Sequence, residues 1–323
     1  MAAAQPRTVR GRIAIYTLAI AFALLVGFPF LWAALTMFRQ DADLYDPTHN
    51  PFVLSKLATF SHITDLLKNT PYLQFIVNNV VIGLAVVVIT LALSLPAAYA
   101  LARLTGRWGE RIGIAIFVTY LVPPTLLFLP LSRLITTIGL QDSIWSLVVV
   151  YPGFTIPLST WLLMGFLRSV PRDIQEQAQV DGYSRLGAVV RTVLPLALPG
   201  IITVVVFTFT LTMQDFIYAL AFVSSSSSMT VSVGVPTVLI RGDVFYWQSL
   251  MASAIIVAVP VALLYNVFLG RFIQRLHPGR RQGISRAHRG SGAAWPPAGR
   301  QRRTPAGIIW RQTTAHSEGT AAS

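Results

Sequence analysis

The chain has 323 residues, of which 54% are apolar and only 11% charged, and its mean hydropathy is +0.62. These values lie outside the range of soluble domains, so the composition excludes an ordinary soluble protein and predicts an integral membrane protein. The formal net charge is +13, and the absence of cysteine excludes structural disulfides and Cys-based metal or redox chemistry.

Six apolar runs are long enough to cross about 30 Å of hydrocarbon as helices, since a helix rises about 1.5 Å per residue. Their continuous apolarity lacks the alternation of a barrel strand, and a helix satisfies its own backbone polar groups in lipid. We therefore predict an all-α membrane protein with a transmembrane domain over residues 13–275 and spans near 13–37, 75–101, 112–136, 143–167, 197–222 and 249–273.

The chain begins with a short basic segment, 1–12, and a first span that is too long for the apolar region of a signal peptide. No convincing A-x-A cleavage site follows it, so we interpret this span as an uncleaved anchor. Several prolines should kink the spans, either as ordinary membrane-helix prolines or as parts of a curved pathway wall: Pro29, Pro96, Pro123, Pro124 and Pro130.

The short connections differ in their positive charge, which predicts orientation. Cations gather before the first span, between the second and third, and around the connection from the fourth to the fifth: Arg7, Arg10, Arg12, Arg103, Arg107, Arg111, Arg168, Arg172, Arg185 and Arg191. The alternate connections are poorer in cations, and 137–142 and 223–248 hold only Arg241 between them. Both termini are therefore expected in the cytoplasm.

A charged insert follows the fourth span on the predicted cytoplasmic side. Pro171 suits a helix start, Asp173 and Glu176 place negative charge in the first turns, and Gly182 suits a stop. We predict a short helix over 172–181 and a second from Ser184 to Leu194. The first is a candidate docking surface for a soluble partner, and the alternative is a helix that lies on the lipid headgroups.

The sequence offers no chemistry of its own for driving transport or catalysis. The only lysines, Lys56 and Lys68, do not follow a glycine, so there is no Walker-type ATP site. The five histidines lie outside the spans, and no H-E-x-x-H or G-x-S-x-G pattern occurs. Asp215 is the only acidic residue well inside a predicted span, which argues against proton coupling.

The insert resembles a known signature. Glu176-Gln177-Ala178, three residues, Gly182, nine residues and Thr192-Val193-Leu194-Pro195 match the E-A-A-x3-G-x9-I-x-L-P layout of permease subunits in bacterial ATP-binding-cassette importers. Asp181 before Gly182 is usual in the sugar-importing class. Further agreement with maltose-type, second-subunit permeases covers roughly residues 13–275 and includes Asn78-Asn79, Gly139 through Ser143, Pro157 through Trp161 and Phe166 through Pro171.

The chain departs from the family pattern at two positions of the signature and in a triplet of the fifth span. Gln177 stands at the second alanine of the signature, and Thr192 at its isoleucine. The usual Trp-Asn-Glu or Trp-Asn-Asp triplet of the fifth span is Met213-Gln214-Asp215 here, which keeps an amide but loses an aromatic stacking surface. These departures concern the strength of coupling and the contact with the solute.

The resemblance implies a division of labour between subunits. The segment from Glu176 to Gly182 would be a coupling helix seated in a separate cassette ATPase, with Gln177 and Ala178 on it, Asp181 at its turn, and Leu194-Pro195 at the start of the fifth span. A purely local structural role is the alternative. The implied protein partners are a second permease, a pair of ATPases that bind ATP and an extracytoplasmic solute-binding protein. The implied location is the bilayer of the bacterial cytoplasmic membrane. The chain itself would bind no cofactor.

Four polar residues are candidates for the translocation pathway: Asn78, Asn79, Gln214 and Asp215. Asp215 lies twenty residues beyond Pro195, about 30 Å along a helix, so it is either a pathway residue or a carboxylate at the outer interface. The sequence leaves the solute open among sugars, polyols and glycerol phosphates.

The basic tail, 276–323, is rich in Gly, Ala, Ser, Pro and Arg and lacks a hydrophobic period, which predicts disorder. We favour a dispensable extension of the kind that translation out of the ancestral frame produces. Contact with anionic lipid is the alternative, and no nucleic acid partner is expected. For the whole chain, the second hypothesis is an ion-coupled secondary transporter, because sodium sites built from carbonyls and hydroxyls leave no carboxylate signal.

Overall fold

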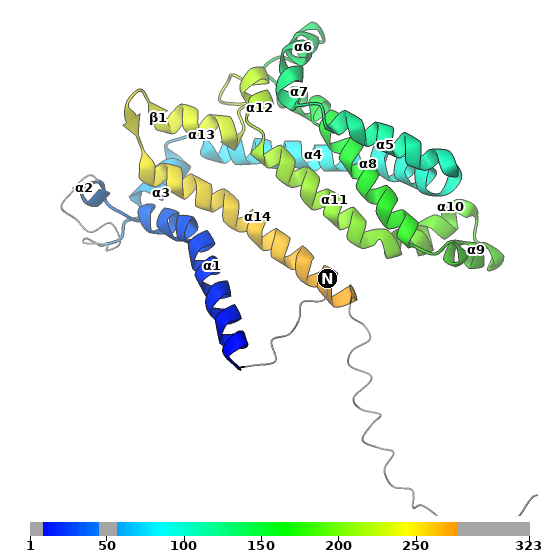
Figure 1. Cartoon of the computed structure of the whole chain (residues 1–323). Coiled ribbons are helices and arrows are strands. Elements are labelled where there is room, and N and C mark those ends of the chain that lie inside the picture. Colours follow the sequence, from blue (N-terminus) through cyan, green and yellow to red (C-terminus); the bar gives the residue numbers. More distant parts are fainter. Residues whose placement is uncertain (1–8, 45–56, 277–323) are drawn as a thin grey trace, which may run out of the picture. The chain divides into compact units, whose positions relative to one another are not determined.

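The computed structural model describes residues 9–44 and 57–276, and most of them are helical (Figure 1). The predicted tail from residue 277 lies outside the described residues, as do the first eight residues of the predicted N-terminal segment. The first half contains α1 Val9–Thr36, α2 Asp41–Leu44, α3 Ser61–Lys68, α4 Tyr72–Tyr99, the π-helical turn η1 Ala100–Leu104, α5 Arg107–Tyr120, α6 Pro124–Thr137, α7 Ile144–Val150 and α8 Pro152–Ser169.

The second half begins with the charged insert and ends with a long helix. Its elements are α9 Arg172–Val180, α10 Arg185–Ala188, the π-helical turn η2 Val189–Val193, α11 Leu194–Gln214, α12 Ile217–Phe222, α13 Val231–Leu239, β1 Ile240–Arg241, β2 Val244–Phe245 and α14 Trp247–Leu276. The two strands form an antiparallel hairpin with Ile240 opposite Phe245.

Within residues 9–44 and 57–276, four helical stretches are long and apolar enough to cross a membrane: Gly11–Thr36, Tyr72–Leu104, Ile144–Ser169 and Arg185–Gln214. A fifth results if the bent pair α5 and α6 is counted as one span, and the described apolar part of α14, Trp247–Leu263, is shorter. The helical membrane architecture is therefore confirmed, whereas the count of six spans stays a prediction.

The predicted span over 112–136 is interrupted by a bend at two of the prolines that were expected to kink it. Between α5 and α6 the chain bends by 83°, and the break falls at Leu121–Pro123. Two adjacent prolines explain it, because a residue before proline avoids the helical region. Pro123 is extended, with ψ at 124°, and Pro124 begins α6, where its missing N–H costs nothing.

The predicted boundaries around the fifth span are wrong. The helix expected over 184–194 does not end there but continues through η2 into α11, giving one stretch over Arg185–Gln214. The span expected to reach 222 instead breaks after Gln214, because Asp215 is extended, with ψ at 129°. The π-helical turn precedes Pro195, whose ring would clash with a carbonyl in the preceding turn, and it widens the helix where that clash arises.

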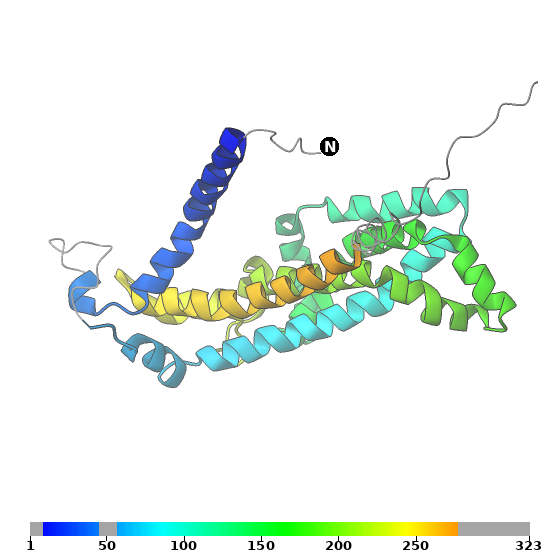
Figure 2. The same cartoon turned by 90° about the horizontal axis from the view of Figure 1, so that it is seen from below.

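Helix α4 packs against both α8 and α11 (Figure 1), and in Figure 2 it is the cyan helix along one side of the bundle. It contributes to both apolar clusters, through Phe75, Ile82 and Val86 to one and through Ala98 to the other. Close approach depends on glycines, since an added Cβ at Gly83 would lie 2.8 Å from the Phe209 ring. Small residues at such crossings let membrane helices pack by van der Waals contact.

Candidate functional site

The predicted short helix of the insert is present as α9. Pro171 ends the preceding helix, and Asp181 is the C-terminal cap of α9. Gly182 then takes a φ of +94°, a conformation that glycine adopts without the strain that a Cβ causes. The next helix, α10, begins at Ser184, whose Oγ accepts a hydrogen bond from the N–H of Gly187 at 3.1 Å.

Helix α9 has a buried face and an exposed face. Gln175 and Ala178 are buried against the rest of the chain. Glu176, Gln177 and Asp181 are exposed. On the exposed side lies a shallow hollow of about 270 Å³, lined by Asp173, Glu176, Gln177, Val180 and Asp181. Because Val180 is 89% exposed between three carboxylates, this face offers an apolar contact with an acidic rim.

The end of the signature lies within a continuous helix. Leu194 is half-buried and packs against the second apolar cluster, which includes Val193 and Ala197. Pro195 is exposed at the start of α11. The structure thus joins α9, through α10 and η2, to the long helix α11.

Asn78 and Asn79 are each 3% exposed and form hydrogen bonds within the chain. The Nδ2 of Asn78 donates to the carbonyls of Ser227 and Met229, both at 2.8 Å. The Oδ1 of Asn79 accepts from the N–H of Val231 at 2.8 Å, and its Nδ2 donates to the Sδ of Met213 at 3.2 Å. These two amides hold the segment before α13 against the start of α4.

Asp215 lies at the break between α11 and α12. Its Oδ2 accepts hydrogen bonds from the Tyr151 hydroxyl at 2.8 Å and from the N–H of Ala219 at 3.1 Å. Its carbonyl accepts from the Ser232 hydroxyl at 2.6 Å. The structure therefore brings three pathway candidates, Asn78, Asn79 and Asp215, to the start of α13, while Gln214 beside them is exposed.

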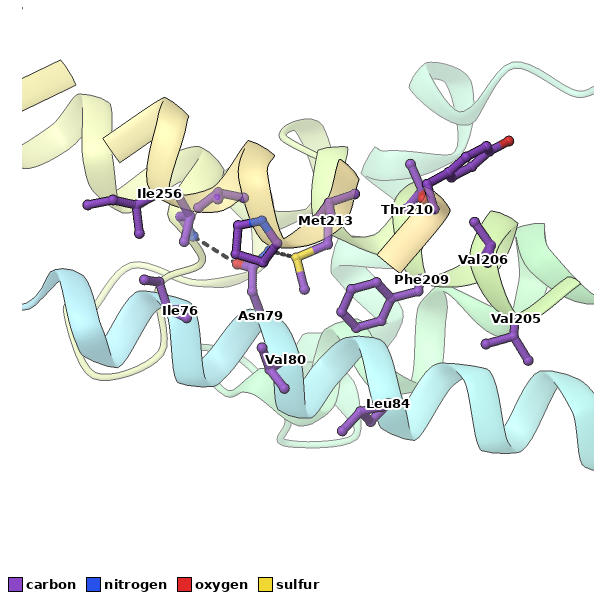
Figure 3. Close-up of a pocket in the computed structure, with 15 residues that line it drawn as sticks. Ile76, Asn79, Val80, Leu84, Val205, Val206, Phe209, Thr210, Met213 and Ile256 are labelled. Carbon is purple, nitrogen blue, oxygen red and sulfur yellow. Dashed lines mark hydrogen bonds between the residues drawn. The ribbon is translucent and has the colours of Figure 1, made fainter. Parts of the chain in front are cut away.

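A groove of about 430 Å³ lies between α4, α11 and α14 (Figure 3). Its walls are almost entirely apolar and include Val80, Phe209 and Ile256. The amide of Asn79 reaches this groove but is already hydrogen-bonded to Met213 and Val231. Such walls suit packing with apolar groups better than binding of a hydroxyl-rich solute, whose polar groups need partners when buried.

Sequence comparison decides the family. A family model described as the binding-protein-dependent transport system inner membrane component matches residues 10–278. The chain belongs to this family. It is thus a transport permease of the inner membrane, and the resemblance drawn from the insert is confirmed.

Similar curated proteins agree with this assignment. The permease is 29% identical over 256 residues to the inner membrane ABC transporter permease protein YcjP of Escherichia coli (strain K12), covering 79% of this chain and 90% of that protein. It is 27% identical over 274 residues to the trehalose/maltose transport system permease protein MalG of Thermococcus litoralis, covering 84% and 97%. The permease is therefore a membrane subunit of an ATP-driven importer.

A solved structure supports the fold. A crystal structure of a bacterial ABC transporter involved in the import of the acidic polysaccharide alginate contains a chain that matches the permease with a TM-score of 0.70. The two are 19% identical, and the match covers 83% of the permease and 100% of that chain.

Sequence reasoning gave no role to several residues that organise the permease. Asp142 has a φ of +57°, and its Oδ1 accepts from the N–H groups of Ser224 and Ser225 at 2.8 and 2.9 Å. Tyr151, Tyr99 and Arg103 also form interhelical hydrogen bonds. The only signal in the sequence was the position of Asp142, three residues after Gly139 in a short connection. Local patterns gave no further signal because these contacts join segments far apart in the chain.

The Asp142 contact predicts a pH dependence. Hydrogen bonds from the N–H groups of Ser225 and Ser224 hold the pKa of Asp142 below its ordinary value of 3.8. Because the folded pKa is the lower one, this carboxylate stabilises the fold above pH 3.8 and loses its contribution as the pH falls through the folded pKa. We expect thermal unfolding in detergent to show Asp142→Asn less stable than wild type at neutral pH, with the difference vanishing in acid.

Asparagine is the matched replacement, since it tolerates a positive φ and keeps an oxygen acceptor. A stability difference between the two proteins that stays constant down to acidic pH would contradict the role of the charge.

Proposed function

We propose that the permease imports a sugar or a related polyol as one of two permease subunits, together with a pair of cassette ATPases and an extracytoplasmic solute-binding protein. The family is binding-protein-dependent by its description. Relatives named for sugars support the solute class, among them the sulfoquinovosyl glycerol transport system permease protein SmoH of Agrobacterium fabrum, 30% identical over 79% of this chain and 89% of that protein.

The exposed face of α9 carries the proposal for coupling. Its apolar Val180 and the carboxylates of Glu176 and Asp181 are accessible, while the opposite face is fixed to the bundle. A partner with an apolar pocket and a basic rim would complement such a face in both shape and charge. In the proposed function this partner is the ATPase, and the exposed Gln177 sets how closely the helix seats on it, while the buried Ala178 holds α9 against the rest of the permease.

ATP is proposed to bind the partner ATPase and not the permease. The sequence has no phosphate-binding loop with a lysine. Within the described ranges 9–44 and 57–276, no group of three or more His, Cys, Asp or Glu side chains could hold a metal ion. The energy of ATP hydrolysis would therefore reach the permease as a movement of α9 that follows closure of the ATPase pair.

The orientation in this proposal places α9 in the cytoplasm with both termini. The connections around Asp142 and 223–248 then face the solute-binding protein. The candidates for the pathway remain Asn78, Asn79, Gln214 and Asp215, now with separate roles. Asn78, Asn79 and Asp215 shape the pathway wall by fixing α13. The exposed amide of Gln214 is available to a solute hydroxyl.

Affinity purification of the tagged permease from its native membranes tests the assembly. We expect wild type to bring down a P-loop ATPase and a second multi-span chain. With Glu176→Lys, the amount of ATPase recovered should fall at least about tenfold, because the change reverses a charge within the docking face. Val180→Glu should lose as much by placing a charge at the apolar contact.

Asp65→Lys is the matched control, since it reverses an exposed charge on α3, far from α9 in the bundle (Figure 1). It should retain the ATPase at the wild-type level. Recovery of the wild-type permease alone or as a homo-oligomer would contradict the ATP-driven assembly and favour ion-coupled transport.

A further inference from the structure

Arg103 links the end of α4 to the corner between α8 and α9. Pro171 prevents α8 from continuing, so the last carbonyls of α8 lack helical partners. The guanidinium Nη2 of Arg103 donates to two carbonyls at this corner, those of Leu167 at 2.8 Å and of Val170. A positive charge is favourable there, because the C-terminal end of a helix carries partial negative charge.

A second link joins α4 to α9 itself. The Nε2 of Gln175, on the buried face of α9, donates to the Tyr99 hydroxyl at 2.8 Å. Gln175 is 8% exposed and Ala178, one turn further, is 5% exposed. The face of α9 opposite the docking face is thus held to the last residue of α4 by a partly buried hydrogen bond.

The other end of α4 is held to the segment before α13. Asn78 and Asn79 bind the backbone of Ser227, Met229 and Val231. Asn79 and Tyr99 are twenty residues apart in one uninterrupted helix, Tyr72–Tyr99, so the two sets of links lie about 30 Å apart along it.

Between its ends α4 is packed against its neighbours as a rigid element. Ile82 and Val86 are fully buried, and the hydroxyls of Thr90 and of Thr155 on α8 share a buried hydrogen bond at 2.6 Å. A packed helix with fixed links at both ends transmits a displacement from one end to the other, because such elements move as units.

We propose that α4 carries the movement of α9 to the segment 223–231. Tyr99 is the positioning residue that attaches α4 to α9, and Arg103 is the one that attaches it to the end of α8, directly before α9. This inference rests on the proposed function for the source of the movement. Loss of the hydrogen bonds of Tyr99 and Arg103 would leave the ATPase bound, but the segment 223–231 would no longer move with the ATPase cycle. Arg103 acts on the corner as a whole, and Tyr99 acts on α9 alone.

The experiment uses the complete assembly in proteoliposomes and one reporter cysteine. The permease contains no cysteine of its own, so Ser226→Cys, at an exposed position beside the Asn78 contacts, gives a single labelling site in this chain. The labelling rate by a membrane-impermeant maleimide is compared between the nucleotide-free state and the state trapped with ATP and vanadate. We expect at least about a threefold difference between the two states in the wild-type background.

The variants then test the links. Tyr99→Phe removes one hydrogen bond and should reduce coupled transport about fivefold. Arg103→Gln should abolish the nucleotide-dependent labelling difference, and Arg103→Lys should restore part of it, because lysine keeps the charge and the donors. Arg107→Gln and Tyr120→Phe are the controls, and both should behave as wild type. Arg107→Gln removes an exposed charge at the start of α5, and Tyr120→Phe removes a hydroxyl at the other end of that helix, away from the links.

Retention of the ATPase by each variant is measured in parallel. A labelling difference that survives in Tyr99→Phe and Arg103→Gln, or that is absent in the wild-type background, would overturn the role of α4 while leaving the assembly intact. Absence of the ATPase from the wild-type preparation would instead overturn the proposed function. If Arg103→Gln does not assemble, the role of α4 is tested by the labelling difference in Tyr99→Phe and Arg103→Lys.

Discussion

The Gly109→Ala permease is expected to lose about 3 kcal/mol of stability, the cost of overpacking a site that has no room for a methyl group. An added Cβ would lie 2.0 Å from the carbonyl oxygen of Leu101 and 2.4 Å from the Oγ1 of Thr105. A backbone carbonyl in η1 has no alternative rotamer, so the helices themselves must separate. Thermal unfolding in detergent, followed by fluorescence-detected size-exclusion chromatography, measures the loss.

Gly165→Ala is the matched control, because no heavy atom lies within 4 Å of an added Cβ there although the residue is in the middle of α8. It should be neutral or slightly stabilising, since alanine has the higher helix propensity. Equal stability of Gly109→Ala and Gly165→Ala would show that η1 and α5 do not pack as closely as described.

The second large effect is expected at Asn78. Asn78→Leu keeps the volume of the side chain but removes both donors to the carbonyls of Ser227 and Met229. Leaving a buried acceptor unsatisfied costs about 1–3 kcal/mol, and the Met229 contact is buried. We expect a loss of about 3 kcal/mol in the same unfolding measurement, together with faster proteolysis of the segment 223–231.

Gln74→Leu provides the comparison. It removes the Nε2 that donates to the Oδ1 of Asn78 at 2.9 Å but leaves both donors of Asn78 in place, and Gln74 is exposed. This change should cost less than about 1 kcal/mol. A larger loss in Gln74→Leu than in Asn78→Leu would mean that the amide does not hold the outer segment.

Local signals predicted α9 well. Proline before a helix and glycine after it act on the residues next to them, and Pro171 and Gly182 bound α9 within a residue or two of the expected limits. The two faces of α9 were not predicted: Ala178 was expected among the residues that contact the ATPase, and the structure buries it with Gln175 against the rest of the chain. What α9 docks against stays a proposal, because the exposed face has no partner among the described residues.

The pathway candidates show where sequence reasoning stopped. The sequence singled out Asn78, Asn79 and Asp215 as polar groups in apolar surroundings, which is the correct signal for buried hydrogen bonds. Their partners lie as far as 152 residues away, at Val231, and no local pattern connects Asn79 with that backbone N–H. The contacts indicate that these residues hold elements together, a role that the sequence did not distinguish from contact with a solute.

The sequence by itself determined the class of protein, its helical membrane architecture and the short helix α9, because apolarity, proline and glycine act over a few residues. It also contained the Pro123-Pro124 pair, but only the tertiary structure decided that the break becomes an 83° bend between α5 and α6. The same holds for the attachment of α4 to both α9 and the segment 223–231. Such links depend on side chains that meet only after the helices pack, so their partners are set by the fold and not by neighbouring residues.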